Sequence, residues 1–140
     1  MITIHLSIHP VAFARPRFNK GRGFNAPHYS LFKRDVIAML KQKVKTPPLE
    51  VACEVVLLFN LERPKVKREE PCVRPDLDNY IKAILDCGNE ILWKDDGLIV
   101  DIHAFKRYGD PGICIIYGKL GELNEKNATA SYPFEVAGDC

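Results

Sequence analysis

Residues 74–82 read Arg-Pro-Asp-Leu-Asp-Asn-Tyr-Ile-Lys and mark the start of a helix. Pro75 sets the entry of the chain, and Asp76 is a good candidate for the N-cap residue. Apolar residues then recur with helical spacing at Leu77, Ile81, Ile84 and Leu85. This pattern predicts a helix over residues 76–87, with Gly88 just after its last residue.

Alternating and continuous apolar runs predict strands on both sides of this helix. Residues 2–9 and 98–108 alternate, and residues 49–61 are apolar on both faces, as in a central strand. Residues 113–117 predict a last strand, paired as a hairpin with 98–108. Residues 28–45 predict a second helix, whose buried stripe is Leu31, Val36, Met39 and Leu40. The expected fold is α+β, a single domain with a mixed sheet of about four strands and helices on one face.

The composition is that of an ordinary soluble protein. The chain has 140 residues, 46% of them hydrophobic and 27% charged, which suits one domain with a real core. We expect a domain over residues 1–118 and a C-terminal tail or appendage over 119–140. No apolar run is long enough for a membrane helix and no signal peptide is visible, so a cytoplasmic protein without a membrane partner is expected. Five scattered cysteines argue against a disulfide framework and a zinc site.

Residues 13–24 interleave four cations with three aromatic residues and two glycines, without helix or strand periodicity. We interpret the segment as a loop. Its cations are candidate contacts to DNA phosphates, namely Arg15, Arg17, Lys20 and Arg22. The simpler alternative is a solvated surface loop.

Two pairs of acidic residues stand out. Asp76 and Asp78 lie at the predicted helix start, and Asp95 and Asp96 lie in a predicted turn. A single Asp at a helix start is most simply a cap, but two such pairs are harder to explain as caps. Carboxylates that meet in the fold need a cation between them, and Mg²⁺ held by a few carboxylates can promote hydrolysis of a phosphodiester. Lys82 lies one turn after Asp78, where it can stabilise a phosphate or simply pair with Asp78.

Two other metal sites fit the motif less well. An EF-hand loop needs Gly and Glu where this chain has Ile81 and Cys87. The metal-binding Asp-x-Asp of a sugar-nucleotide transferase is possible in principle. However, the chain is short for that fold and lacks repeated βα units.

These motifs resemble those of a known family. Three stretches resemble the RusA family of Holliday-junction resolvases, found in bacteria and prophages: Pro75-Asp76-Leu77-Asp78-Asn79-x-x-Lys82, Leu92-Trp93-Lys94-Asp95-Asp96 and Lys106. Arg15-Pro16-Arg17 looks like the family's early basic motif, although alone it would be a weak signal. The resemblance spans roughly residues 2–117. Many members carry a lysine just before the Arg-Pro-Arg, where Phe13-Ala14 stands here, and this departure concerns DNA affinity.

The resemblance implies a homodimer that nicks four-way junction DNA symmetrically in recombination and repair. It implies dependence on Mg²⁺, or Mn²⁺ in its place, and no small-molecule cofactor. The catalytic residues would be Asp76, Asp78, Lys82 and Asp96. The three aspartates would hold the metal, Asp95 would be a further ligand or a turn residue, and Arg74 and Lys106 would join the DNA contacts. Two alternatives stay open: a non-catalytic module that binds branched DNA, and a nuclease for other branched DNA.

Overall fold

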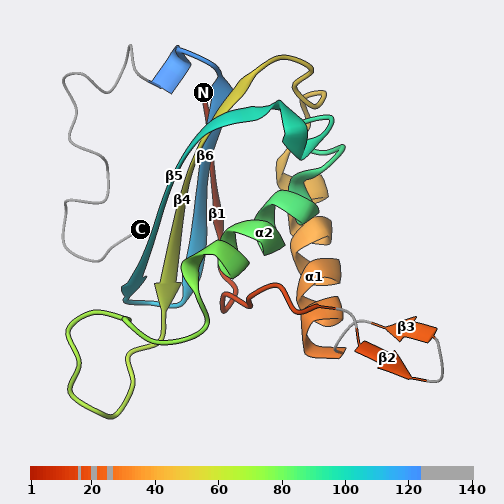
Figure 1. Cartoon of the computed structure of the whole chain (residues 1–140). Helices are drawn as coiled ribbons and strands as arrows, with labels where there is room; N and C mark the ends of the chain where they lie inside the picture. Colours follow the sequence, from red (N-terminus) through yellow and green to blue (C-terminus); the bar gives the residue numbers. More distant parts are fainter. Residues whose placement is uncertain (16, 20–21, 25–26, 124–140) are drawn as a thin grey trace.

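The computed structural model describes residues 1–15, 17–19, 22–24 and 27–123 (Figure 1). Its elements in chain order are β1 (Ile2–Leu6), β2 (Arg17–Asn19), β3 (Arg22–Phe24), α1 (Pro27–Lys43), β4 (Cys53–Leu61), α2 (Leu77–Gly88), the 3₁₀ helix η1 (Asp96–Leu98), β5 (Ile99–Tyr108) and β6 (Gly112–Lys119). The main sheet has the order β1-β6-β4-β5, in which β4 and β5 are parallel and the other neighbours antiparallel. Figure 1 shows α1 and α2 on the same face of this sheet, which confirms the predicted α+β fold.

The predicted hairpin between the last two strands is wrong. The crossover through α2 places β5 parallel to β4 along one edge, and β6 pairs with β4 along the other edge. The connecting turn passes the end of β4, where the Gly109 amide donates a hydrogen bond to the carbonyl of Leu61 at 2.9 Å. β6 therefore fills the space between β4 and β1, and β4 becomes a central strand, as its apolar sequence predicted.

Three local expectations also differ from the structure. Within the predicted loop over 13–24, β2 and β3 form a short antiparallel pair. Leu31 is 50% exposed, because α1 begins at Pro27 and turns another stripe to the core. That stripe is Tyr29, Phe32, Val36 and Leu40. Gly88 is the last residue of α2 rather than the residue after it.

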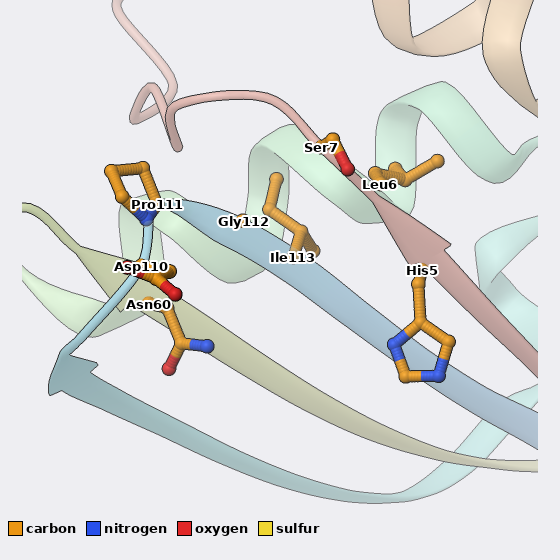
Figure 2. Close-up of a pocket in the computed structure, with 8 residues that line it drawn as sticks. All are labelled: His5, Leu6, Ser7, Asn60, Asp110, Pro111, Gly112 and Ile113. Atoms are coloured by element: carbon orange, nitrogen blue, oxygen red, sulfur yellow. The ribbon is translucent and has the colours of Figure 1, made fainter. Parts of the chain in front are cut away.

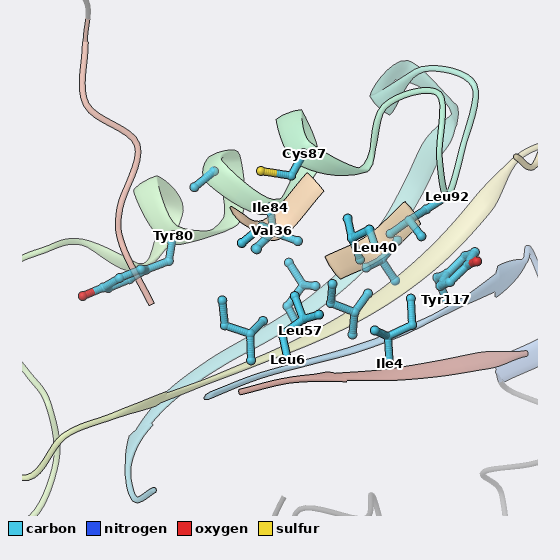
Figure 3. Close-up of a cluster of buried hydrophobic side chains, with 14 of the residues drawn as sticks. Ile4, Leu6, Val36, Leu40, Leu57, Tyr80, Ile84, Cys87, Leu92 and Tyr117 are labelled. Atoms are coloured by element: carbon cyan, nitrogen blue, oxygen red, sulfur yellow. The ribbon is translucent and has the colours of Figure 1, made fainter. Parts of the chain in front are cut away.

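The main core lies between the helices and the sheet (Figure 3). Val36 and Leu40 from α1 and Ile84 from α2 belong to the same cluster as Leu57 and Tyr117 from the sheet. These side chains are between 0% and 1% exposed. At roughly 25 cal/mol per Å² of apolar area, such burial is the main force that holds the helices on the sheet.

Trp93 locks the connector after α2 to this core. Its ring meets that of Tyr117 edge to face at 5.9 Å, and its Nε1 donates to the Asn89 side chain at 3.2 Å. Gly88 leaves the space for this ring, since a Cβ there would lie 2.6 Å from the indole. The connector therefore positions η1 and the acidic pair that precedes β5.

The other face of the sheet carries a smaller apolar cluster, which includes Val56, Leu58 and Leu123. The buried Glu54 carboxylate accepts a hydrogen bond from the Leu123 amide at 3.1 Å, and the Met1 amino group pairs with Glu122 at 2.9 Å. The chain is thus attached to the sheet beyond the predicted boundary at residue 118. Residues 124–140 of the predicted tail lie outside the described residues. Among the helices that the structure describes, none is long and apolar enough to cross a membrane.

Candidate active site

Asp76 and Asp78 stand at the first turn of α2. Asp76 occupies the N-cap position with extended backbone angles, but its side chain makes no capping hydrogen bond. Both residues are exposed, and no ion pair or hydrogen bond to another described residue engages either carboxylate. Capping is therefore not what these side chains do, and both carboxylates are available to a ligand.

Two contacts fix this end of α2 in the fold. The Lys106 ammonium on β5 donates to the carbonyls of Val73 at 2.8 Å and Pro75 at 3.0 Å. The Phe13 amide donates to the carbonyl of Asn79 at 2.9 Å. Hydrogen bonds from a charged donor are among the stronger ones in proteins. The segment that leads to Asp76 is therefore held between β5 and residues near the start of the predicted basic loop.

Lys82 does not pair with Asp78, the simpler of its two predicted roles. Its ammonium lies 3.7 Å from the Asp86 carboxylate and 4.9 Å from the centre of the Phe13 ring. The side chain is 51% exposed, so this ammonium can still reach a phosphate in solvent. Phe13 therefore lies beside the candidate site. In the sequence, only the cations around Phe13 had indicated a role for this segment.

Asp86 is a neighbour of the site that was not among the predicted site residues. The hydroxyl of Tyr29 is buried and has no hydrogen-bond partner within the described part of the chain. Burial raises the pKa of Tyr29, and the nearby charge of Asp86 raises it further. Asp86 therefore faces both Lys82 and a protonated phenol. The i, i+4 spacing of Lys82 and Asp86 was the sequence signal for this contact.

Asp95 and Asp96 lie in a different local setting. The Asp95 carboxylate accepts a hydrogen bond from the Gly97 amide at 2.9 Å and so caps η1. A side chain on Gly97 would meet this carboxylate at 2.7 Å. Of the two roles considered for Asp95, turn residue is the one that the structure displays. Asp96 begins η1 and is half-buried.

The two acidic pairs lie at opposite ends of β5. Asp96 comes just before Ile99, which pairs with Cys53 at the start of β4, whereas the segment before Asp76 is bonded to Lys106. Figure 1 accordingly shows α2 beginning near the arrowheads of β4 and β5, and η1 near the start of β5. At about 3.3 Å per residue, Ile99 and Lys106 are roughly 23 Å apart along the strand.

The metal-ligating side chains of the described residues are consequently not gathered at one place in a single chain. Within the described ranges, no three His, Cys, Asp or Glu side chains form a group that could hold a metal ion. Two carboxylate oxygens on one Mg²⁺ lie within about 4 Å of each other, far less than the length of β5. A single chain therefore brings Asp76 and Asp78 to one place and leaves Asp95 and Asp96 at another.

The predicted DNA contacts whose side chains the structure describes lie near the first of these pairs. Arg74 is exposed next to Asp76, and Lys106 is bonded to the segment around it. Arg15 is exposed two residues after Phe13, which is bonded to the first turn of α2. Arg17 and Arg22 lie on β2 and β3, whose side chains are not described, and Lys20 lies outside the described residues. Cationic residues thus lie near the start of α2, where Asp76 and Asp78 stand.

The sequence as a whole agrees with this local picture. Residues 7–116 match the family model of Endodeoxyribonuclease RusA, so the chain belongs to the RusA family, whose members are endonucleases that resolve Holliday junctions. This confirms the resemblance noted in the motifs. The chain is also similar to the uncharacterized protein YqaN of Bacillus subtilis strain 168, with 28% identity over 118 residues. That match covers 72% of this chain and 83% of YqaN.

Proposed function

We propose that this protein is a divalent-cation-dependent endodeoxyribonuclease that resolves Holliday junctions by paired symmetric nicks, as a homodimer, in DNA recombination and repair. One observation carries the proposal. In a chain of the RusA family, Asp76 and Asp78 are exposed at a fixed helix start, and no contact to a described residue occupies their carboxylates. The Lys106 ammonium ties the segment before Asp76 to β5, which fixes the position of this helix start.

The residues around this helix start can bind and orient a phosphodiester. Arg74 and Lys82 are exposed cations near the two carboxylates, and the Phe13 ring steadies the Lys82 ammonium. A phosphate that these cations hold would have its developing charge stabilised during attack. Asp76 and Asp78 can accept hydrogen bonds from a water molecule and direct its lone pair toward the phosphorus atom. Lys106 holds the segment before Asp76 against β5 and so helps to fix where α2 begins.

The donor chemistry of Asp76 and Asp78 suits Mg²⁺, which prefers carboxylate oxygens. The three-aspartate site expected from the sequence does not fit one chain, however, because Asp96 lies at the other end of β5. A two-fold dimer that sets η1 of one copy beside the start of α2 of the other would unite all three aspartates, at two equivalent places. We propose this arrangement. Its two sites would match the two strands that a resolvase must cut.

The test is a cleavage assay with the full chain on four-way, three-way and linear DNA, with and without Mg²⁺. We expect nicking of the four-way junction only when Mg²⁺ or Mn²⁺ is present. Asp78→Asn should abolish nicking while junction binding survives. Asp35→Asn is the matched control, because Asp35 is an exposed acid on α1 paired only with the adjacent Arg34 among the described residues. If Asp78→Asn lost binding together with nicking, the catalytic role of Asp78 would be wrong.

A second candidate function is a non-catalytic module that binds branched DNA. The separation of the acidic pairs within one chain favours it, because isolated carboxylate pairs could simply decorate helix starts. In that case Asp78→Asn would behave like the parent protein, and EDTA would change nothing. A nuclease for other branched DNA is distinguished by the substrate panel alone, since it would cut three-way DNA at least as well as four-way DNA.

A further inference from the structure

A second polar site lies at the carboxyl end of β4. A pocket of about 130 Å³ opens there between the end of β1 and the turn before β6 (Figure 2). Its polar lining comes from His5, Ser7, Asn60 and Asp110. His5 and Asn60 alternate with residues of the main core along their strands, so they lie on the face of the sheet away from the helices.

A glycine forms part of the pocket wall. Gly112 pairs with Asn60 in the β4–β6 ladder and carries no side chain into the space beside it. A Cβ at this position would lie 3.2 Å from the carbonyl oxygen of Leu6, a tight contact with the backbone of β1. A larger residue would therefore strain the neighbouring strand as well as narrow the pocket.

Asn60 is the residue that points to a ligand. Its side chain is only 6% exposed, and no hydrogen bond links its carboxamide to any other described residue. The Tyr29 hydroxyl is the buried side-chain polar atom without a partner among the described residues, so the Asn60 amide still reaches solvent within the pocket and can bind a ligand there without first breaking a hydrogen bond to a described residue. Figure 2 shows the carboxamide of Asn60 and the imidazole of His5 projecting from the same side of the sheet. Inside the pocket, the Asn60 carboxamide thus presents a donor and an acceptor. Neither is hydrogen-bonded to another described residue.

The size and chemistry of the pocket suit one polar aromatic ring. Its volume is close to the roughly 150 Å³ of a cavity that accommodates benzene. A carboxamide donates and accepts in one plane, a carboxylate accepts, and a hydroxyl does both. This combination can read the edge of a nucleobase, which presents donors and acceptors in a plane. A purine, with two fused rings, exceeds this volume, so a pyrimidine fits better.

The location connects the pocket to the proposed DNA substrate. Asn60 pairs with Arg107 in the β4–β5 ladder, and the adjacent Lys106 holds the segment before Asp76. The Arg63 guanidinium lies 5.5 Å from the centre of the Tyr108 ring at the same end of the sheet. The pocket and the helix start with Asp76 therefore flank one end of the sheet from opposite faces, and cations lie between them.

We propose that this pocket holds an unpaired pyrimidine base of the DNA substrate. This rests on the proposed function for the identity of the ligand. A junction exposes bases at its crossover, and a base already unpaired costs least to extrude into a protein pocket. Holding one base there would fix which phosphate reaches Asp76 and Asp78. The pocket would therefore determine where along the DNA the protein cuts, rather than whether it cuts.

The direct test is a titration of the full chain with dCMP, TMP and dAMP, followed by NMR of the Asn60 side-chain amide. We expect saturable shifts of this signal with the pyrimidine nucleotides, and at least tenfold weaker binding of dAMP. Asn60→Leu keeps the branched shape and the number of heavy atoms, removes the donor and acceptor, and should weaken pyrimidine binding at least tenfold. Since Asn60→Leu has no amide signal, the Ser7 and Gly112 backbone amides report its binding.

Controls make the outcome decisive. Thr3→Val lies on the same face of β1 outside the pocket and should leave binding unchanged. If Asn60→Leu fails to fold, Ser7→Leu at the rim blocks the pocket instead and should abolish binding. Equal shifts with inorganic phosphate alone, or equal pyrimidine binding by the blocked variant, would overturn the proposal.

A second readout separates this proposal from the proposed function. On a four-way junction with a mobile crossover, Asn60→Leu should redistribute the cut positions while total nicking changes less than about threefold. Pyrimidine binding without any nicking would leave the pocket in place and refute the nuclease. Nicking with unchanged cut positions and no pyrimidine binding would refute the pocket and leave the nuclease in place.

Discussion

Mixing two inactive variants should restore activity if the aspartates are shared between copies. The perturbation is a pair of proteins, one with Asp78→Asn and one with Asp96→Asn, mixed under conditions that exchange subunits. In a heterodimer with shared sites, one site receives both substitutions and the other receives neither. The intact site then contains Asp78 from one copy and Asp96 from the other.

The expected magnitude follows from the geometry and from counting. Lys106, next to the segment before Asp76, is roughly 23 Å along β5 from Ile99, whereas ligands of one Mg²⁺ lie within about 4 Å of each other. Each variant alone should therefore be inactive. Equal amounts that assort randomly give about half heterodimers, and each has one intact site of two. The mixture should thus regain about one quarter of the parental nicking sites.

The assay is nicking of a labelled four-way junction in denaturing gels, run beside native gels that detect resolved duplexes. A single intact site should yield nicked junctions and few resolved products, because paired cuts need two sites. The control is a mixture of Asp76→Asn with Asp78→Asn, which leaves a defect in every site and should stay inactive. If the first mixture were as inactive as its components although heterodimers were present, each site would lie within one chain and the proposed sharing would be refuted.

Three further predictions concern single residues. Gly88→Ala should lower the free energy of unfolding by about 1–3 kcal/mol in urea titrations, because the new Cβ would meet the Trp93 ring at 2.6 Å. The control Ser30→Ala, on the exposed side of α1, should change this free energy little. Lys106→Met removes both hydrogen bonds to the segment before Asp76 and should slow junction nicking at least about tenfold. Equal slowing by Lys41→Met, on the exposed side of α1, would contradict the role of Lys106 in holding this segment. In a Cys140→Ser chain at pH 8, a thiol reagent should quickly label Cys72 and no other described thiol, since Cys53, Cys87 and Cys114 are buried. Burial raises the pKa of Cys53 and takes that of Cys87 to about 12, so both stay protonated at this pH, and fast labelling of a second thiol before unfolding would refute the assignment.

Patterns that span only a few residues were sufficient to predict most of the helices and strands. The spacing of Leu77, Ile81 and Ile84 predicted α2 within one residue at each end, because helical periodicity is a local property. β1 and β4 were also predicted, because their alternating or continuous apolar character reflects the surfaces they bury, although β1 ends at Leu6 rather than at residue 9 and β4 begins at Cys53 rather than at residue 49. The Asp-x-Asp at the helix start likewise lies where the motif placed it.

Contacts between distant residues could not be read in this way. The hairpin prediction failed because strand order depends on which edge of β4 remains open after the α2 crossover, and no local pattern records that choice. The contact of the Lys82 ammonium with the Phe13 ring also gave no signal in the sequence, since Phe13 belongs to the N-terminal segment, far from Lys82 along the chain. The pocket that Asn60 lines beside Gly112 and the turn before β6 also gave no signal in the sequence.

The sequence by itself determined the α+β class, the helices and strands, the family and the acidic motifs, because each depends on residues close together along the chain. Only the tertiary structure decided that Asp76 and Asp96 lie at opposite ends of β5. A parallel crossover returns the chain to the start of the neighbouring strand, so residues before and after the crossover helix end up a full strand length apart.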